Sequence, residues 1–154
     1  MRKRSKYRPK GVIYDTMAHV TTGLARVGAI ASGTTLKIKN HSALEQLRTG
    51  RATRGDIDVL IDAFNITEAL AMQCIGDAYG NEIRAAQDAL LELGRRGAET
   101  GKFILRGPDL TTFNLAMEIH DAQLDACTVS ELEKAIDYVT AIINAKQVRV
   151  IVQR

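Results

Sequence analysis

Residues 53–93, TRGDIDVLIDAFNITEALAMQCIGDAYGNEIRAAQDALLEL, decide the fold class of this chain. Apolar side chains recur there at steps of three and four residues, which is the spacing of one face of an α-helix. They are Ile57, Leu60, Ile61, Phe64, Ala71, Ile75, Tyr79, Ile83, Ala86, Leu90 and Leu93. Gly76 and Gly80 interrupt the run, so it predicts either one long bent helix or two helices that meet there.

Sequence signals for helix starts lie further along the chain. Thr128 and Glu131 have the spacing of a capping box, in which each side chain satisfies a backbone N–H of the other residue, and they open the last helix. Thr53 and Asp56 resemble such a box, although Glu or Gln is the usual third residue. Between them, helical spacing over residues 110–127 predicts one more helix, with Leu110, Phe113, Met117, His120, Leu124 and Cys127 on one face.

Glycines and polar residues predict where other helices begin and end. Asn40 or Ser42 caps a short helix that Gly50 closes. Gly94 and Gly97 mark the end of the run quoted above.

The chain before residue 40 has a weaker pattern. Residues 11–39 contain several glycines and many β-branched side chains, so we expect an extended or irregular segment. Residues 35–39 alternate between polar and apolar side chains, which predicts a short strand or an extended strip with Leu36 and Ile38 facing inward.

These patterns together predict a mainly α protein. Residues 40–154 form an antiparallel helical bundle, preceded by the segment 11–39 and by a basic, flexible N-terminal arm at residues 1–10. Short extended segments at residues 102–106 and 148–152 lie at the periphery of the bundle. No run approaches the roughly 20 apolar residues that a membrane span needs, so we expect no membrane association.

Charge is distributed unevenly along the chain. The net charge of the protein is +3, yet the first ten residues contain six Lys and Arg and no acid, and the other residues contain 15 Lys and Arg against 18 Asp and Glu. Such a run repels itself and attracts polyanions. If it binds the phosphates of DNA or RNA, the contacting residues are Arg2, Lys3, Arg4, Lys6, Arg8 and Lys10, with Tyr7 stacking on a base.

Arg48, Arg51 and Arg54 recur at steps of three residues around Gly50. On a continuous helix they would share one face and extend a basic surface on the body. The two helices around this turn have the size of a helix-turn-helix, but the second begins with acidic residues, which repel a DNA backbone. We therefore expect nucleic-acid contacts to come from the arm.

No catalytic motif is complete, so we expect a protein that is not an enzyme and needs no cofactor. Residues 28–35 nearly match a phosphate-binding loop, but Thr34 stands where the loop needs its lysine. Glu118 precedes His120 by two residues, whereas metal sites in bundles place Glu and His three apart. We therefore predict that His120 is a hydrogen-bonded residue of the core or its boundary and that the chain has no metal site.

A buried carboxylate needs a partner, because an unpaired charge in a protein interior is costly. Glu68 lies close to the apolar stripe, so one hypothesis joins Asn65, Glu68 and His120 in a polar cluster inside the bundle. The alternative leaves the carboxylate of Glu68 in water. Cys74 and Cys127 are expected to be small buried side chains.

Three segments resemble small bacteriophage- and prophage-encoded proteins of proteobacteria. They are Arg2–Lys10, Ile66–Leu70 and His120–Ala126. The resemblance implies an accessory role during phage growth in the cytoplasm of a bacterial host, and it transfers no catalytic residue.

Two hypotheses follow. The protein is either an accessory factor that binds nucleic acid through its arm, or an inhibitor or adaptor whose helical body binds a host or phage protein. A homo-oligomer is compatible with both.

Overall fold

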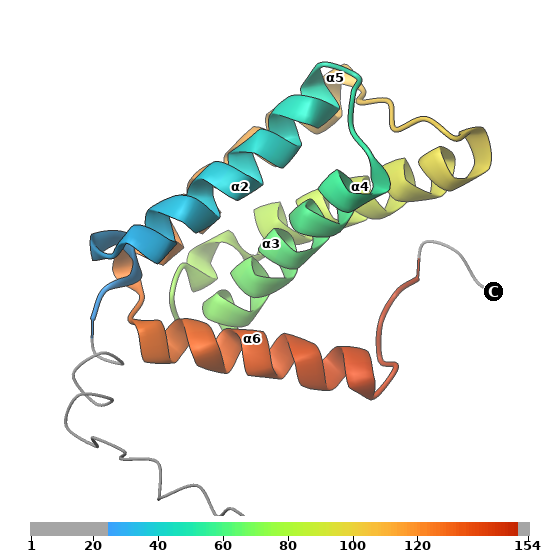
Figure 1. Ribbon diagram of the computed structural model, residues 1–154. Helices are drawn as coiled ribbons and strands as arrows, with labels where there is room; N and C mark the ends of the chain where they lie inside the picture. Colours follow the sequence, from blue (N-terminus) through green and yellow to red (C-terminus); the bar gives the residue numbers. More distant parts are fainter. Residues whose placement is uncertain (1–24, 151–154) are drawn as a thin grey trace, which may run out of the picture.

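The computed structural model describes residues 25–150, and this part of the chain is mainly helical (Figure 1). The predicted helical class is therefore confirmed. The arm at residues 1–10 lies outside the described residues. Within residues 25–150 the elements are η1 (Val27–Ala29), α2 (Ala31–Arg48), α3 (Arg54–Met72), η2 (Asp77–Tyr79), α4 (Gly80–Thr100), α5 (Gly107–Ala126) and α6 (Val129–Asn144).

Helix α3 is the centre of the fold. It contacts α2, α4, α5 and α6, and Figure 1 shows α2 and α6 on opposite sides of it. The buried face of α3 includes Ile57, Leu60 and Phe64. The Phe64 ring packs against Phe113 of α5, with 5.7 Å between the ring centroids and a tilt of 47°. The apolar stripe that decided the fold class thus forms the middle of the core.

Helices α2 and α5 lie side by side. The ammonium of Lys37 is 2.6 Å from Asp125 Oδ1, and Nε2 of His41 is 2.7 Å from Asp121 Oδ2. Residue numbers rise along α2 as they fall along α5, so these two helices run in opposite directions.

The strand or extended strip predicted at residues 35–39 and the helix start predicted at Asn40 or Ser42 are both wrong, because α2 begins at Ala31 and includes all of these residues. Its buried positions are Gly33, Asn40, Ala43, Leu44 and Leu47, at helical spacing. The polar Asn40 occupies the middle of this stripe and hides its period. The apparent alternation is fortuitous: Ile38, expected to face inward, is 62% exposed.

The break at Gly76 and Gly80 separates two helices. Gly76 has φ +78°, a left-handed conformation that favours glycine, and α4 begins at Gly80. The helix end predicted at Gly94 and Gly97 is wrong, since α4 continues to Thr100 and Gly101 ends it with φ +72°. Gly97 is instead required by packing, because a Cβ there would meet the Phe103 ring at 2.2 Å.

Both predicted capping boxes are confirmed. The backbone N–H of Thr128 donates to Glu131 Oε2 at 2.8 Å, and the N–H of Glu131 donates to Thr128 Oγ1 at 3.2 Å. At the start of α3, the N–H of Thr53 donates to Asp56 Oδ2 at 2.7 Å. Asp is therefore long enough to replace the usual Glu here.

Two other expectations have mixed outcomes. Cys127 is buried as predicted, but Cys74 is exposed in the turn after α3, with φ +63°, so that prediction is wrong. Residues 102–106 connect α4 to α5, with Phe103 packed on the core and Ile104 exposed.

No helix in the described part of the chain has the length and apolarity required to cross a bilayer.

Candidate functional site

The predicted nucleic-acid contacts, Arg2, Lys3, Arg4, Lys6, Tyr7, Arg8 and Lys10, lie outside the described residues. The structure does fix where the chain enters the body. The N–H of Val129 donates to the carbonyl of Ala25 at 2.9 Å, and the N–H of Val27 donates to the carbonyl of Cys127 at 3.1 Å. The chain from the arm therefore joins the bundle at the corner between α5 and α6.

A second group of cations lies where α2 ends and α3 begins. Arg48 pairs with Glu45 at 2.7 Å, and Arg54 pairs with Asp58 at 3.0 Å. Arg51 has no acidic partner within 4.0 Å among the described residues, and its Nε donates to Thr49 Oγ1 at 3.3 Å. The helix stops between these arginines, so they do not form the single helical face that their spacing suggests.

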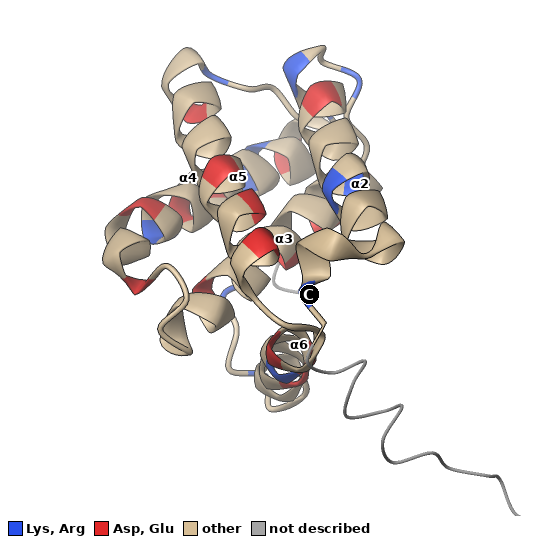
Figure 2. Cartoon of the chain, turned by 90° about the vertical axis from the view of Figure 1, so that its left-hand side faces the viewer, with Lys and Arg blue, Asp and Glu red and all other residues tan. Residues whose placement is uncertain are grey.

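The connection between α4 and α5 adds Lys102 to this end of the bundle. Arg48, Arg51 and Lys102 line an open cavity of about 430 Å³ together with Leu47, Phe103 and Ile104. Figure 2 shows Lys and Arg at the end of α2 and in the connections beyond it. We call Arg48, Arg51 and Lys102 the basic end. In contrast, α5 contains four acidic residues and no Lys or Arg.

His120 lies at the centre of a buried polar network and is 0% exposed. Its Nδ1 is 2.8 Å from Thr67 Oγ1, and its Nε2 is 3.1 Å from Asn40 Nδ2. The prediction of a core histidine is confirmed. Because its partners lie on α2 and α3, the imidazole links three helices.

The hydrogen bonds of the partners assign the imidazole tautomer. The Thr67 hydroxyl donates to the carbonyl of Ala63 at 2.8 Å, so its oxygen accepts from Nδ1–H of His120. The amide of Asn40 donates to Nε2, which must carry no proton. Burial lowers the pKa of His120 to about 4, so the imidazole is neutral at pH 7. A second proton would place two donors face to face.

Gln123 extends the network toward the end of α3. Its Nε2 donates to the carbonyl of Thr67 at 3.1 Å and to the carbonyl of Ile75 at 2.7 Å. Gly76 lies close to this amide, since a Cβ there would be 3.0 Å from Gln123 Nε2. The network therefore fixes the turn that follows α3.

The predicted cluster of Asn65, Glu68 and His120 is wrong in its membership. Residues 65 and 67 are about 200° apart around a helix, so Asn65 cannot face the imidazole that Thr67 contacts. Asn65 and Glu68 lie on another side of α3, where both accept hydrogen bonds from Gln87 of α4. The Glu68 carboxylate is partly exposed, as the alternative stated.

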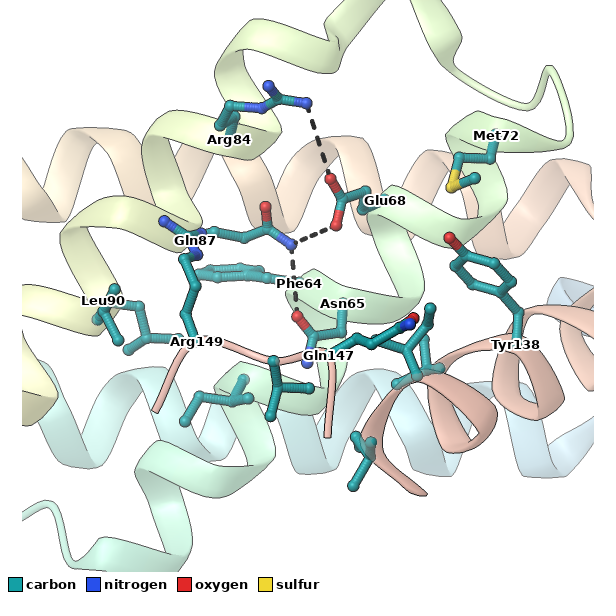
Figure 3. A pocket seen from close by; sticks show the side chains of 16 residues that line it. Phe64, Asn65, Glu68, Met72, Arg84, Gln87, Leu90, Tyr138, Gln147 and Arg149 are labelled. Atoms are coloured by element: carbon teal, nitrogen blue, oxygen red, sulfur yellow. Dashed lines mark hydrogen bonds and ion pairs between the residues drawn. The ribbon is translucent and has the colours of Figure 1, made fainter. Parts of the chain in front are cut away.

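That side of α3 forms the wall of a pocket of about 520 Å³ between α3, α4 and α6 (Figure 3). Gln87 Nε2 donates to Glu68 Oε2 at 3.0 Å, and Arg84 approaches the other carboxylate oxygen to 4.0 Å. Apolar side chains complete the pocket, among them Phe64, Met72, Leu90, Tyr138, Ile142 and Ile143. The segment after α6 borders it, and Arg149 there pairs with Asp88 of α4.

The sequence does not reveal this pocket, because its walls come from three segments far apart in the chain. The one feature of the sequence that points to the pocket is the wide apolar surface of α6, which is more than one neighbouring helix can bury. Between residues 25 and 150, no group of three or more His, Cys, Asp or Glu is arranged to hold a metal ion.

Comparison with protein-family models, with curated proteins and with solved structures finds no match to this chain.

Proposed function

We propose that this protein is a non-catalytic accessory factor that binds nucleic acid through Arg2, Lys3, Arg4, Lys6, Tyr7, Arg8 and Lys10. The observation that carries the proposal is the separation of charge: six cations stand in the first ten residues, and acids outnumber bases in the rest of the chain. Contacts of this kind neutralise phosphates and give affinity without reading a base sequence.

We infer that the arm is attached to an antiparallel helical bundle. The opposite directions of α2 and α5 support that arrangement, as do the contacts of Asn65 with Gln87 and of Glu68 with Arg84 across α3 and α4, where residue numbers rise along one helix as they fall along the other. The setting implied by the resemblance, the cytoplasm of a bacterium during phage growth, belongs to the same proposal.

The charges of the described body support a restricted mode of binding. Arg51 and Lys102 project from the basic end without acidic partners within 4.0 Å among the described residues. Three of the four acidic side chains of α5 pair with basic side chains of other helices, Asp125 with Lys37, Asp121 with His41 and Asp109 with Arg96, so α5 offers a phosphate backbone no cation of its own. A nucleic acid held by the arm is thus expected to contact the body at the basic end rather than along α5.

The proposal is tested by measuring affinity for generic duplex and single-stranded DNA across a series of salt concentrations. The full chain is compared with a variant in which the six cations of the arm are replaced by Gln, which keeps the length of the chain. We expect the slope of log affinity against log salt to fall by about four to six in the variant.

A matched control replaces Lys134 and Lys146, two exposed cations of the α6 region, with Gln. We expect its slope to stay within about one of the original. Equal slopes for the full chain and the arm variant would contradict the proposal.

One observation favours the alternative, a protein-binding inhibitor or adaptor. The pocket between α3, α4 and α6 combines an apolar surface with the polar groups of Gln87, Glu68 and Arg84, as binding sites for other molecules commonly do. Under this hypothesis a partner of the body is captured equally well by the full chain and by the arm variant. Loss of capture with the arm variant would favour the nucleic-acid proposal.

A further inference from the structure

The connection between α4 and α5 has two different faces. Lys102, Ile104 and Arg106 are exposed, whereas Phe103 and Leu105 are partly buried and pack against the core. Alternation at a step of two residues is the pattern of an extended segment with one side on the core. The outer side therefore presents a cation, an isoleucine that is 63% exposed, and a second cation, in that order. We call Lys102, Ile104 and Arg106 the connection face.

The cations at this end of the bundle are available to an anion. Among the described residues, Arg51, Lys102 and Arg106 have no carboxylate oxygen within 4.0 Å. Arg51 and Lys102 come from two different connections and share, with Arg48, the cavity of about 430 Å³ described above. No Asp or Glu of the described chain lines this cavity. Its charged side chains are therefore all positive.

The acids and helix dipoles around the cavity do not cancel this charge. Asp109, which follows the connection, pairs with Arg96 at 3.6 Å, and Glu99, which precedes it, does not line the cavity. The C-termini of α2 and α4 and the N-termini of α3 and α5 meet at this end of the bundle. Their dipoles have opposite signs and offset one another, so the side chains set the sign of the potential.

Apolar groups lie beside these cations. Leu47, Phe103 and Ile104 line the same cavity. An inorganic anion would leave them uncovered, whereas a nucleic acid with unpaired bases presents phosphates and apolar base faces side by side. A duplex keeps its base faces inside the stack, so it would contact the cations but not Ile104. The mixture of groups thus favours a single strand.

We propose that the connection face and Arg51 form a binding site for single-stranded nucleic acid. Arg51, Lys102 and Arg106 contact phosphates of the strand, and a base packs against Ile104. The inference rests on the proposed function and deepens it, since it places a second site on the body and names the form of nucleic acid. The arm supplies affinity for any phosphate backbone, and the connection face adds a preference for unpaired bases.

The base contact is tested by the fluorescence anisotropy of a labelled strand of about 15 thymidine nucleotides, of its duplex with the complementary strand, and of an abasic strand of equal length. We expect the full chain to bind the thymidine strand most tightly. Ile104→Ser should weaken that binding about three- to tenfold and leave the abasic strand unaffected. Ile38→Ser is the matched control and should change neither affinity, because Ile38 is 62% exposed and lies on α2, outside the site.

The phosphate contacts are tested with the same thymidine strand across a series of salt concentrations. Arg51→Gln combined with Lys102→Gln should lower the slope of log affinity against log salt by about 1.4, because each lost contact lowers it by about 0.7. Lys134→Gln combined with Lys146→Gln removes two exposed cations elsewhere and should leave the slope within about 0.5 of the original. Circular dichroism checks that each variant remains helical.

Two results would overturn the proposal. One is equal affinity of Ile104→Ser and the original protein for the thymidine strand, and the other is a salt slope that the Arg51 and Lys102 substitutions leave unchanged. The proposed function is judged separately, by the variant with Gln in place of the six cations of the arm. If only the arm variant loses salt-dependent binding, the proposed function stands and the connection face is wrong. If only the Arg51 and Lys102 variant loses it, the site on the body stands and arm binding is wrong.

Discussion

His120 donates its Nδ1–H to the hydroxyl oxygen of Thr67 across 2.8 Å, and this bond joins α5 to α3 in the interior of the bundle. Neither residue is accessible to solvent. The other imidazole nitrogen also has a partner: the side-chain amide of Asn40 of α2 donates to Nε2 at 3.1 Å. Because both imidazole nitrogens have a partner on another helix, the side chain of His120 fixes the relative positions of α2, α3 and α5.

Replacing Thr67 with Val tests the bond directly. Valine keeps the shape of the side chain but leaves the buried Nδ1–H of His120 without an acceptor, which costs about 1–3 kcal/mol. We expect that loss in the free energy of unfolding measured with urea. Thr67→Ser keeps the hydroxyl and should lose less.

Thr112→Val is the matched control for Thr67→Val. The Thr112 hydroxyl also donates to the carbonyl four residues earlier, that of Pro108, but it bonds no side chain of another helix. Its loss should change stability by less than about 0.5 kcal/mol. Equal losses at the two positions would mean that the bond to His120 contributes nothing.

The low pKa of His120 predicts that the protein loses stability in mild acid. In the unfolded chain the imidazole takes up a proton near pH 6.5, whereas in the folded protein it does so only near pH 4. The unfolded state therefore binds more protons between these values, and stability falls as the pH drops from 6.5 toward 4. At pH 5 the loss relative to pH 7.5 is about 2 kcal/mol.

Urea unfolding of the original protein and of His120→Gln at the two pH values isolates this contribution. Gln does not titrate, so the loss in mild acid should be smaller by about 2 kcal/mol in the variant. Subtracting the two proteins removes the contribution of other groups, such as Asp62, whose pKa is raised by burial. The same pH dependence in both proteins would show that His120 does not titrate in this way.

Gly97 predicts a third outcome, which concerns packing rather than hydrogen bonds. A methyl group there would overlap the Phe103 ring, which packs against the core. We expect Gly97→Ala to cost about 1–3 kcal/mol in thermal or chemical unfolding, as overpacking does. Gly80→Ala is the control, because its Cβ would meet nothing within 4 Å and its φ is −58°. It should be neutral or stabilising by up to about 1 kcal/mol.

The sequence predicted α3 and α4 because their buried faces are continuous apolar stripes. It failed for the start of α2 because Asn40 stands in the buried face, where the apolar pattern expects a hydrophobic residue. Asn40 is stable there only because His120, 80 residues later, accepts its hydrogen bond. A pattern of apolar residues carries no information on such a partner, so a buried polar pair hides the helices that it joins.

The candidate sites were predictable to different degrees. The charge of the arm is a property of adjacent residues and is visible in the sequence. The pocket of Figure 3 unites Glu68, Gln87 and Tyr138 from three helices, and only their packing brings them together. Likewise, Lys102 joins Arg51 at the basic end through the connection after α4. The prediction that Gly97 ends a helix was wrong because a glycine that ends a helix and a glycine that makes room for an aromatic ring look identical in a sequence.

Glu68 provides the last prediction, because it follows Thr67 in the chain but points to another side of α3. Its carboxylate accepts from Gln87 at 3.0 Å and approaches Arg84 only to 4.0 Å, with much of the side chain exposed. Exposed ion pairs contribute about 0–1 kcal/mol. We therefore expect Glu68→Ala to change the free energy of unfolding by less than about 0.5 kcal/mol.

Urea unfolding of Glu68→Ala and Thr67→Val under one set of conditions makes the comparison sharp. The two substitutions lie one residue apart on the same helix, so differences in helix propensity and position are small beside the predicted difference in burial. If Glu68→Ala instead cost as much as Thr67→Val, the carboxylate would have to be paired inside the bundle.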